Sequence, residues 1–209
     1  MIGPVTELAA NFPYFAQRLD RNGVPPLWKR DPGFASLVHI ILEQQVSLAS
    51  AQAAFSRLVN NLGVVTPDRF AGLDAATARI IGFSHQKFGY CLGIARLLVE
   101  NPDLLVVDDL DDAAAFSKLC GLRGVGPWTA AVYLMFADLR CDLWPRGDRA
   151  LVVSMESVMG LSSVPTYDDA DAIAEAWAPH RATAARILWH DYLGGLDYSD
   201  RQGIAVLRR

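Results

Sequence analysis

The sequence predicts an all-α fold, because nearly every periodic segment spaces its apolar residues as a helix does and no convincing strand alternation occurs. The 209 residues are 52% hydrophobic and 20% charged, which is the composition of a globular chain with a sizeable core. Glycines and prolines divide the chain into short amphipathic segments. From the length and the order of these segments we expect two helical subdomains flanking a cleft.

The N-terminal part is expected to begin with little regular structure. Five prolines lie within residues 1–33, so one short helix over about 6–20 and a loop are predicted there. An apolar stripe over residues 34–42 then predicts a helix, which leads through a polar Glu-Gln-Gln bend into a long helix over 47–62. Gly63 is placed to end that helix.

Helical signals continue as far as residue 193. Further helices are expected over residues 67–72, 75–81, 86–100, 109–119, 148–159, 167–178 and 179–193. We expect residues 1–209 to form a single domain of two interleaved lobes. Residues 63–150 would form one lobe, and residues 1–62 together with 151–209 would form the other.

The stretch over residues 119–151 is the most informative part of the chain. A helix ends there, a five-residue turn follows over 122–126, and a second helix starts at Pro127, which suits the first helical turn. Gly124 and Gly126 permit tight backbone and leave amides uncovered by side chains. Bare amides at a helix N-terminus bind anions, and a DNA phosphate is the obvious anion. The stretch looks like a helix-hairpin-helix, a motif that grips the DNA backbone without reading its sequence.

Other pieces of sequence accompany the hairpin. They are LEQQVSLASAQAA at 42–54, GVGPWTA at 124–130, WPRGD at 144–148 and RATAARILWHDYL at 181–193. In this order they resemble the helix-hairpin-helix (HhH-GPD) DNA glycosylase superfamily, and within it the 3-methyladenine DNA glycosylase II branch. The resemblance implies an all-α enzyme in which the hairpin is followed by a Gly/Pro-rich loop and an aspartate. Larger members begin with a β-domain, for which this chain has no room.

Asp148 is the candidate catalytic residue, since it follows Trp128 by twenty residues at the family's spacing. Cleaving an N-glycosidic bond develops positive charge on the sugar, and a nearby carboxylate stabilises that charge or activates the attacking water. An aspartate that opens a helix is otherwise an ordinary N-cap. Asp142 lies in the connecting loop and is expected to be solvated.

The resemblance also indicates the base pocket, which Trp128, Val132 and Trp189 would line. The Trp128 indole suits a cationic alkylated base, although an aromatic at helical spacing is also typical of a core. Val132 stands where a relative has a pocket tyrosine, which implies a roomier pocket. Family members that also cut the DNA backbone have a lysine at the position of Trp128, so no lyase activity is expected.

The remaining site residues would hold DNA. Gln44 and Gln45 lie in the bend that resembles the family's wedge, which fills the gap left by an extruded base, and Gln45 is the preferred plug; a polar pair in a bend is otherwise ordinary surface. The phosphate-binding hairpin would comprise Arg123, Gly124, Gly126 and Thr129. By resemblance, the backbone carbonyls of Cys120, Leu122 and Val125 would hold a structural monovalent cation.

The composition indicates which cofactors the protein uses and where in the cell it acts. The net charge of −4 argues mildly against a general nucleic-acid coat protein, although a local basic patch suffices for an enzyme. Three cysteines without metal-ligand spacing are read as buried small hydrophobes, so no iron–sulfur cluster and no catalytic cofactor are expected. No signal peptide or membrane-spanning run is recognised. We therefore expect a cytoplasmic monomer that acts on nucleoid DNA and has no membrane partner.

The resemblance and the residues together predict a monofunctional DNA N-glycosylase. It would flip alkylated bases, of the 3-methyladenine type and beyond, out of double-stranded DNA and leave an abasic site. One alternative is a glycosylase for uracil, mismatched thymine or an oxidised purine. Another is a non-catalytic DNA-binding protein that retains the hairpin.

Overall fold

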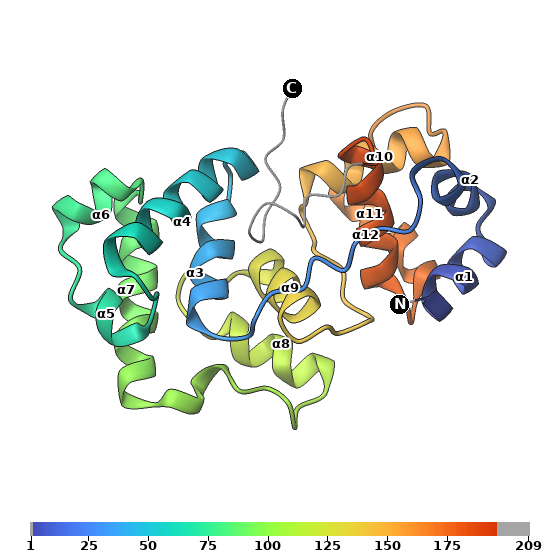
Figure 1. Cartoon of the computed structure of the whole chain (residues 1–209). Helices are drawn as coiled ribbons and strands as arrows, with labels where there is room; N and C mark the ends of the chain where they lie inside the picture. The colour runs from blue at the N-terminus through green and yellow to red at the C-terminus, as the bar shows by residue number, and fades with distance from the viewer. Residues whose placement is uncertain (1, 196–209) are drawn as a thin grey trace. The chain divides into compact units, whose positions relative to one another are not determined.

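The computed structural model describes residues 2–195 of the chain, and these residues form helices joined by turns, with no β-strand among them (Figure 1). The all-α prediction is therefore confirmed. None of the helices in this part of the chain has the length and apolar character needed to cross a membrane.

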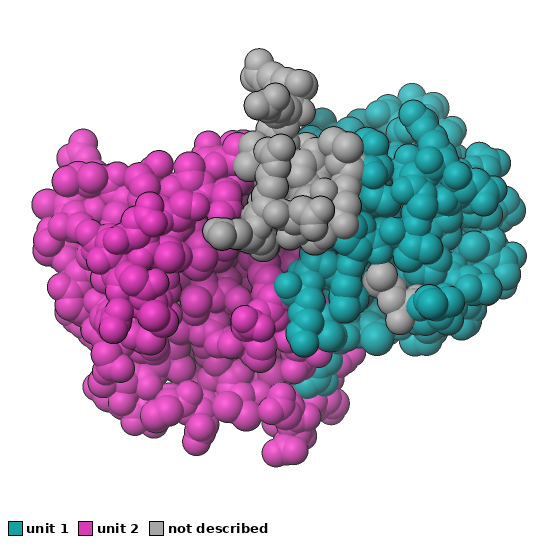
Figure 2. All heavy atoms as spheres, viewed as in Figure 1, with its two compact units in different colours: residues 1–29, 139–203 teal, residues 30–138, 204–209 magenta. Residues whose placement is uncertain are grey.

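The described residues divide into two compact units (Figure 2). Unit 1 comprises residues 2–29 and 139–195, and unit 2 comprises residues 30–138. These boundaries differ from the expected division near residues 62 and 150. The expected lobes also included Met1 and residues 196–209, which lie outside the described residues.

Unit 2 carries the hairpin. Its elements are α3 (Phe34–Glu43), α4 (Leu48–Leu62), α5 (Pro67–Ala71), α6 (Ala75–Ile81), α7 (His85–Glu100), a 3₁₀ turn (Pro102–Leu105), α8 (Asp112–Cys120) and α9 (Pro127–Phe136). Helix α3 packs against α4, α7 and α9, which is why residues 30–62 belong with the hairpin. Every residue from Thr129 to Phe136 is buried, so α9 is the central helix of this unit.

Local sequence explains how most of these helices begin. The side chains of Ser47, Thr66, Asp74, Ser84 and Asp111 each accept a hydrogen bond from a backbone N–H in the first turn of α4, α5, α6, α7 and α8, respectively. Such caps satisfy donors that the helix itself leaves unpaired. The predicted helices at 67–72, 75–81 and 86–100 are accordingly confirmed within a few residues.

Unit 1 joins the two ends of the described chain. Its elements are α1 (Ile2–Asn11), α2 (Pro13–Asn22), α10 (Arg149–Met159), α11 (Tyr167–Ala174), a 3₁₀ turn (Glu175–Trp177) and α12 (Arg181–Tyr192). The single helix expected over 6–20 is wrong, because Phe12 is extended and Pro13 restarts the chain as α2. The fully buried Trp177 centres the core, where its indole N–H donates to the Tyr14 hydroxyl at 3.0 Å.

Candidate nucleic-acid interface

The hairpin between α8 and α9 is held from inside by apolar side chains. Leu122 and Val125 are buried, and the Val125 N–H donates to the Leu122 carbonyl at 2.9 Å, which closes the turn. Within residues 2–195, the amides of Gly124 and Gly126 donate to no hydrogen-bond acceptor. Bare amides at the start of a helix are what an anion site requires, so binding of a phosphate here stays a prediction.

Both the backbone conformation at residue 124 and the side chain packed against it require a glycine there. Its φ of +95° lies in the region that favours glycine, and an added Cβ would lie 2.3 Å from Cγ of Tyr90 on α7. The Arg123 guanidinium lies over the same tyrosine ring, 6.0 Å from the ring centroid. The Tyr90 hydroxyl accepts a hydrogen bond from the Gln86 side-chain amide at 2.6 Å. The exposed Arg123 is therefore displayed on a fixed aromatic support.

The bend after α3 forms a tight turn over Glu43–Val46. Gln44 has φ −56° and ψ 122°, Gln45 has φ +57°, and the Val46 N–H reaches the Glu43 carbonyl at 3.5 Å, as in a type II turn. Gln45 and Val46 are exposed. The side chain that sequence reasoning preferred as the plug thus stands at the tip of this turn.

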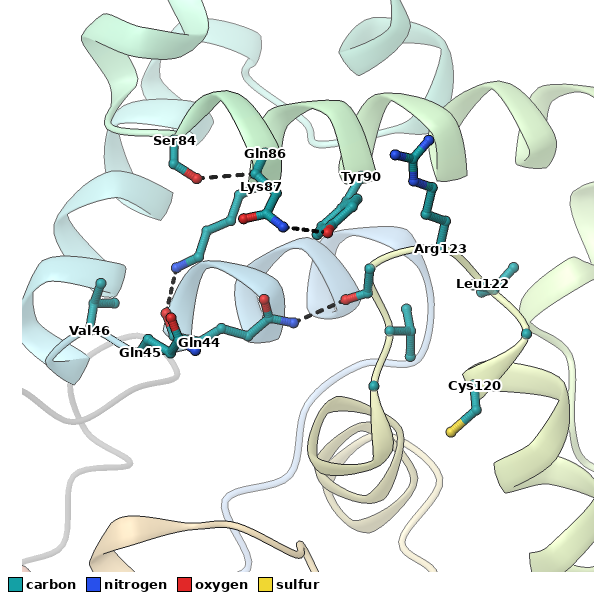
Figure 3. Close-up of a pocket in the computed structure, with 14 residues that line it drawn as sticks. Gln44, Gln45, Val46, Ser84, Gln86, Lys87, Tyr90, Cys120, Leu122 and Arg123 are labelled. Carbon is teal, nitrogen blue, oxygen red and sulfur yellow. Dashed lines mark hydrogen bonds between the residues drawn. The ribbon is translucent and has the colours of Figure 1, made fainter.

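Gln44 has a different environment from its neighbour. Its side-chain amide donates to the Gly124 carbonyl at 3.1 Å (Figure 3). It also donates to the Thr129 hydroxyl at 2.8 Å. The Gln44 amide is thus held against the hairpin, and its place in the wedge stays a prediction. Thr129 itself is 1% exposed, and its part in phosphate binding also stays a prediction.

Lys87 on α7 completes this arrangement. Its ammonium donates to the carbonyls of Leu42 and Gln44 at 2.8 and 2.6 Å, and burial lowers the pKa of Lys87. The Glu43–Val46 turn, the N-terminal part of α7 and the hairpin enclose an open pocket of about 820 Å³ (Figure 3). Sequence reasoning missed Lys87 and Tyr90, since neither belongs to a recognisable motif.

Helix α9 separates the two predicted pocket residues that it carries. Trp128 is partly exposed at the first turn, whereas Val132 is 2% exposed. A side chain buried to that degree offers a base no surface, so the assignment of Val132 to an open pocket is not supported. On α12 in unit 1, Trp189 is partly exposed while its neighbours from Ala182 to Leu188 are buried.

Asp148 lies in unit 1 and opens α10. Its Oδ1 accepts the Leu151 N–H at 3.0 Å, so the side chain is an N-cap, and the carboxylate is half-buried. The preceding Gly147 has φ +79°, which a glycine adopts without strain and which turns the loop into the helix. The N-cap role is therefore confirmed, and it leaves the catalytic role as a prediction.

The loop that leads to Asp148 is held by charged groups. Asp142 pairs through both carboxylate oxygens with Arg181, at 2.9 and 3.0 Å, and accepts the Arg181 backbone N–H at 3.3 Å. Further along, the Trp144 indole N–H donates to Asp171 at 2.9 Å, and Arg146 pairs with the same carboxylate. The expectation that Asp142 is merely solvated is wrong, because it anchors the start of α12.

The cysteines differ in their surroundings. Cys91 is buried, which raises its thiol pKa, whereas Cys120 is partly exposed and Cys141 is exposed. The reading of all three as buried residues is thus wrong for Cys141. Among the described residues, no group of three or more histidine, cysteine, aspartate or glutamate side chains is arranged to hold a metal ion.

Comparison with known proteins agrees with the hairpin and the fold. Residues 38–129 match the family described as HhH-GPD superfamily base excision DNA repair protein. This part of the chain is therefore similar to the helix-hairpin-helix superfamily. The match covers α4 to α8, the hairpin and the first residues of α9, and it ends before the loop that carries Asp148.

The similar proteins include enzymes named for 3-methyladenine. The chain is 27% identical over 166 residues to DNA-3-methyladenine glycosylase 1 of Schizosaccharomyces pombe, covering 77% of this chain and 72% of that protein. It is 28% identical over 182 residues to the DNA-3-methyladenine glycosylase of Bacillus subtilis, covering 80% of this chain and 57% of that protein. Across the curated relatives, the matched region spans between 56% and 76% of their length.

A solved structure shares the fold over most of the chain. It is the 3-methyladenine DNA glycosylase of Schizosaccharomyces pombe in complex with abasic DNA, which matches with a TM-score of 0.84 at 23% identity. The match covers 93% of this chain and 99% of that one. The helical architecture is therefore that of a known DNA glycosylase fold.

Proposed function

We propose that the chain is a DNA N-glycosylase of base excision repair that hydrolyses the N-glycosidic bond of alkylated bases, chiefly of the 3-methyladenine type. The observation that carries the proposal is the hairpin, where the bare amides of Gly124 and Gly126 stand within a segment that matches a base-excision family. The partner is double-stranded DNA, whose phosphates those amides and Arg123 would bind. The names of the relatives support the class of lesion. The enzyme would act as a monomer in the cytoplasm.

Asp148 would supply the chemistry. A flipped alkylated purine already carries positive charge, so it leaves readily and needs little acid catalysis. The developing charge on the sugar is then the main barrier, and the Asp148 carboxylate would stabilise it or activate the attacking water. Trp128 and Trp189 would offer aromatic faces to the cationic base, an attraction worth about 0.5–2 kcal/mol.

The enzyme would release the base without cutting the DNA backbone. A lyase needs an amine that is free to attack the sugar, and Trp128 occupies the family position of that lysine. Lys87 donates to two carbonyls and Lys118 donates to the Val106 carbonyl at 2.7 Å, so both are engaged as ammonium groups. These contacts support a monofunctional enzyme.

The hairpin would also hold a monovalent cation on backbone oxygens. The three predicted ligands, the carbonyls of Cys120, Leu122 and Val125, belong to residues that line the pocket beside the hairpin. The Leu122 carbonyl accepts the Val125 N–H and keeps a second lone pair. Carbonyl oxygens suit a hard cation, which would neutralise part of the charge of a bound phosphate.

Release of free bases from a methylated duplex tests the proposal. Chromatography should detect 3-methyladenine, while matched duplexes with uracil, mismatched thymine or oxidised guanine should lose no base. Borohydride should trap no protein–DNA adduct, and strand cleavage should require added alkali. Release of only another base would favour a different glycosylase, and binding without any release would favour a non-catalytic DNA-binding protein.

A further inference from the structure

Gln45 has a backbone conformation that its residue type disfavours. Its φ is +57° at the third position of a type II turn, where glycine or asparagine is usual. A left-handed backbone costs energy for a residue with a Cβ and persists only where the surroundings hold it. The exposed tip of the turn carries no buried side chain of its own that could do so, since Gln45 and Val46 are both exposed.

The restraint comes from two side chains, Lys87 on α7 and Gln44 at the second position of the turn. Lys87 donates to the carbonyls of Leu42 and Gln44, and its positive charge lies at the C-terminal end of α3, where a cation is favourable. The Gln44 side chain donates to the Gly124 carbonyl and the Thr129 hydroxyl. One residue therefore fixes the turn to α7, and the other fixes it to the hairpin (Figure 3).

We infer that Lys87 and Gln44 are positioning residues, which lock the Gln45 turn to the hairpin so that both engage DNA as one preorganised element. The inference rests on the proposed function, because it assigns the turn a role at the gap left by an extruded base. The hairpin amides bind phosphates in any duplex, whereas Gln45 acts only where a base is missing or flipped. Loosening the turn should therefore lower the preference for a damaged site more than it lowers binding to intact DNA.

Two duplexes that differ at one nucleotide measure this preference. One contains a tetrahydrofuran analogue of an abasic site, and the other is intact; fluorescence anisotropy gives the dissociation constant of each. Lys87→Met removes the donors, and Lys87→Arg keeps charge and donors. Lys118→Met is the matched control, since Lys118 also donates to a carbonyl, that of Val106, which is not part of the turn. Loss of a positive charge weakens binding to both duplexes by the same factor, so it leaves the ratio of the two dissociation constants unchanged.

The expected result is a loss of roughly tenfold in the preference of Lys87→Met for the abasic duplex, which corresponds to about 1.4 kcal/mol. Lys87→Arg should recover most of that preference, and Lys118→Met should match the wild type. Because Lys87 acts through the turn, Gln45→Ala alone should lose the preference, and adding Lys87→Met to it should cost little more. A 2-aminopurine beside the abasic analogue should report insertion of Gln45 in the wild type and in Lys87→Arg only.

The outcomes separate this inference from the proposed function. Preference and 2-aminopurine signal that survive in Lys87→Met would overturn the inference, as would independent, additive losses in the double variant. A wild type that neither prefers the abasic duplex nor releases methylated bases would instead contradict the proposed function. Should Lys87→Met unfold at a lower urea concentration, Gln44→Ala provides the same comparison, because it removes only the contacts to the hairpin.

Discussion

The hairpin of unit 2 and the loop before Asp148 in unit 1 hold their candidate functional groups in different ways. Gly124 is fixed by close packing, since the Tyr90 ring fills the space that a side chain would need. The loop over residues 139–148 is fixed by charge, through the Asp142–Arg181 and Arg146–Asp171 pairs. Packing is indifferent to salt and intolerant of added atoms, whereas partly exposed ion pairs weaken in salt.

The two regions would also differ in function, because the hairpin would bind DNA and Asp148 would catalyse base release. Asp148→Asn should separate the two roles most sharply. Asparagine caps a helix about as well as aspartate, so folding and duplex binding should persist, while base release should fall by roughly 10²–10⁴-fold. Timed release of 3-methyladenine from methylated DNA measures the change, beside anisotropy for binding and urea unfolding for stability.

Asp111→Asn is the matched control for that substitution. Asp111 also caps a helix, by accepting the Ala114 N–H at 2.8 Å, but it lies at the start of α8 and carries no proposed chemistry. It should release bases at the wild-type rate. Full activity in Asp148→Asn would refute the catalytic assignment, and a loss of folding would leave Asp148 as a structural cap.

A pair of glycine substitutions tests whether the hairpin is held by packing. Gly124→Ala should lower the free energy of unfolding by about 2–4 kcal/mol, since it combines a disfavoured φ with a clash against Tyr90. Gly126→Ala should change it by less than about 0.5 kcal/mol, because φ is −87° and no atom lies within 4 Å of the new Cβ. Urea denaturation measures both, and equal losses would contradict the packing account.

Acid should reveal a further buried group of unit 2. His39 is stacked on Phe55 at 4.0 Å, and burial, followed by the charge of Arg30, lowers the pKa of His39 to about 2. In the unfolded chain His39 takes up a proton near pH 6.5, whereas in the folded protein it stays neutral. Above pH 6.5 it is neutral in both states and does not lower the free energy of unfolding. Below that pH, stability should fall by up to about 1.4 kcal/mol per pH unit until the folded pKa is reached.

His39→Phe retains an aromatic ring and removes the titration. Urea unfolding of both proteins between pH 7 and pH 5 should therefore give a steeper fall for the wild type, with a difference of up to about 2 kcal/mol at pH 5. Parallel curves would show that the His39 environment is not the source of acid sensitivity.

The smallest expected effect concerns the loop over residues 139–148, which ion pairs hold in place. Asp142→Ala should cost about 1 kcal/mol at low salt, because it removes a partly exposed ion pair and an acceptor for the Arg181 N–H. The cost should shrink in 1 M salt, whereas the cost of Gly124→Ala should not. Urea unfolding at both salt concentrations checks this. If salt changed the cost of Gly124→Ala but not that of Asp142→Ala, the assignment of packing to the hairpin and of ion pairs to the loop would be contradicted.

What the sequence predicts well here depends on neighbours in the chain. Gly124, Gly126 and Pro127 follow local backbone rules, so the hairpin and its bare amides could be recognised directly. Asp148 could be recognised as the start of a helix, since its cap is also local. The resemblance of separated segments supplied the family.

What the sequence does not predict depends on distant contacts. The bond from Lys87 to Gln44 joins residues that are 43 positions apart, and the bond from Gln44 to Thr129 joins residues 85 apart. No local pattern distinguishes Gln44 from Gln45, and only the fold shows that one faces the hairpin and the other is exposed. The burial of Val132 could not be predicted for the same reason, since burial follows from the surroundings of α9.

The discontinuity of unit 1 has a consequence for biosynthesis. The described part of unit 2 is the continuous segment over residues 30–138, so these residues can pack on one another once that segment has left the ribosome. Helices α1 and α2 emerge first but pack on α10 and α12, and the Trp177 bond to Tyr14 spans 163 positions. We expect nascent chains to gain protease resistance in unit 2 first, while the apolar faces of α1 and α2 wait for the last helices and for the chaperones that shield them.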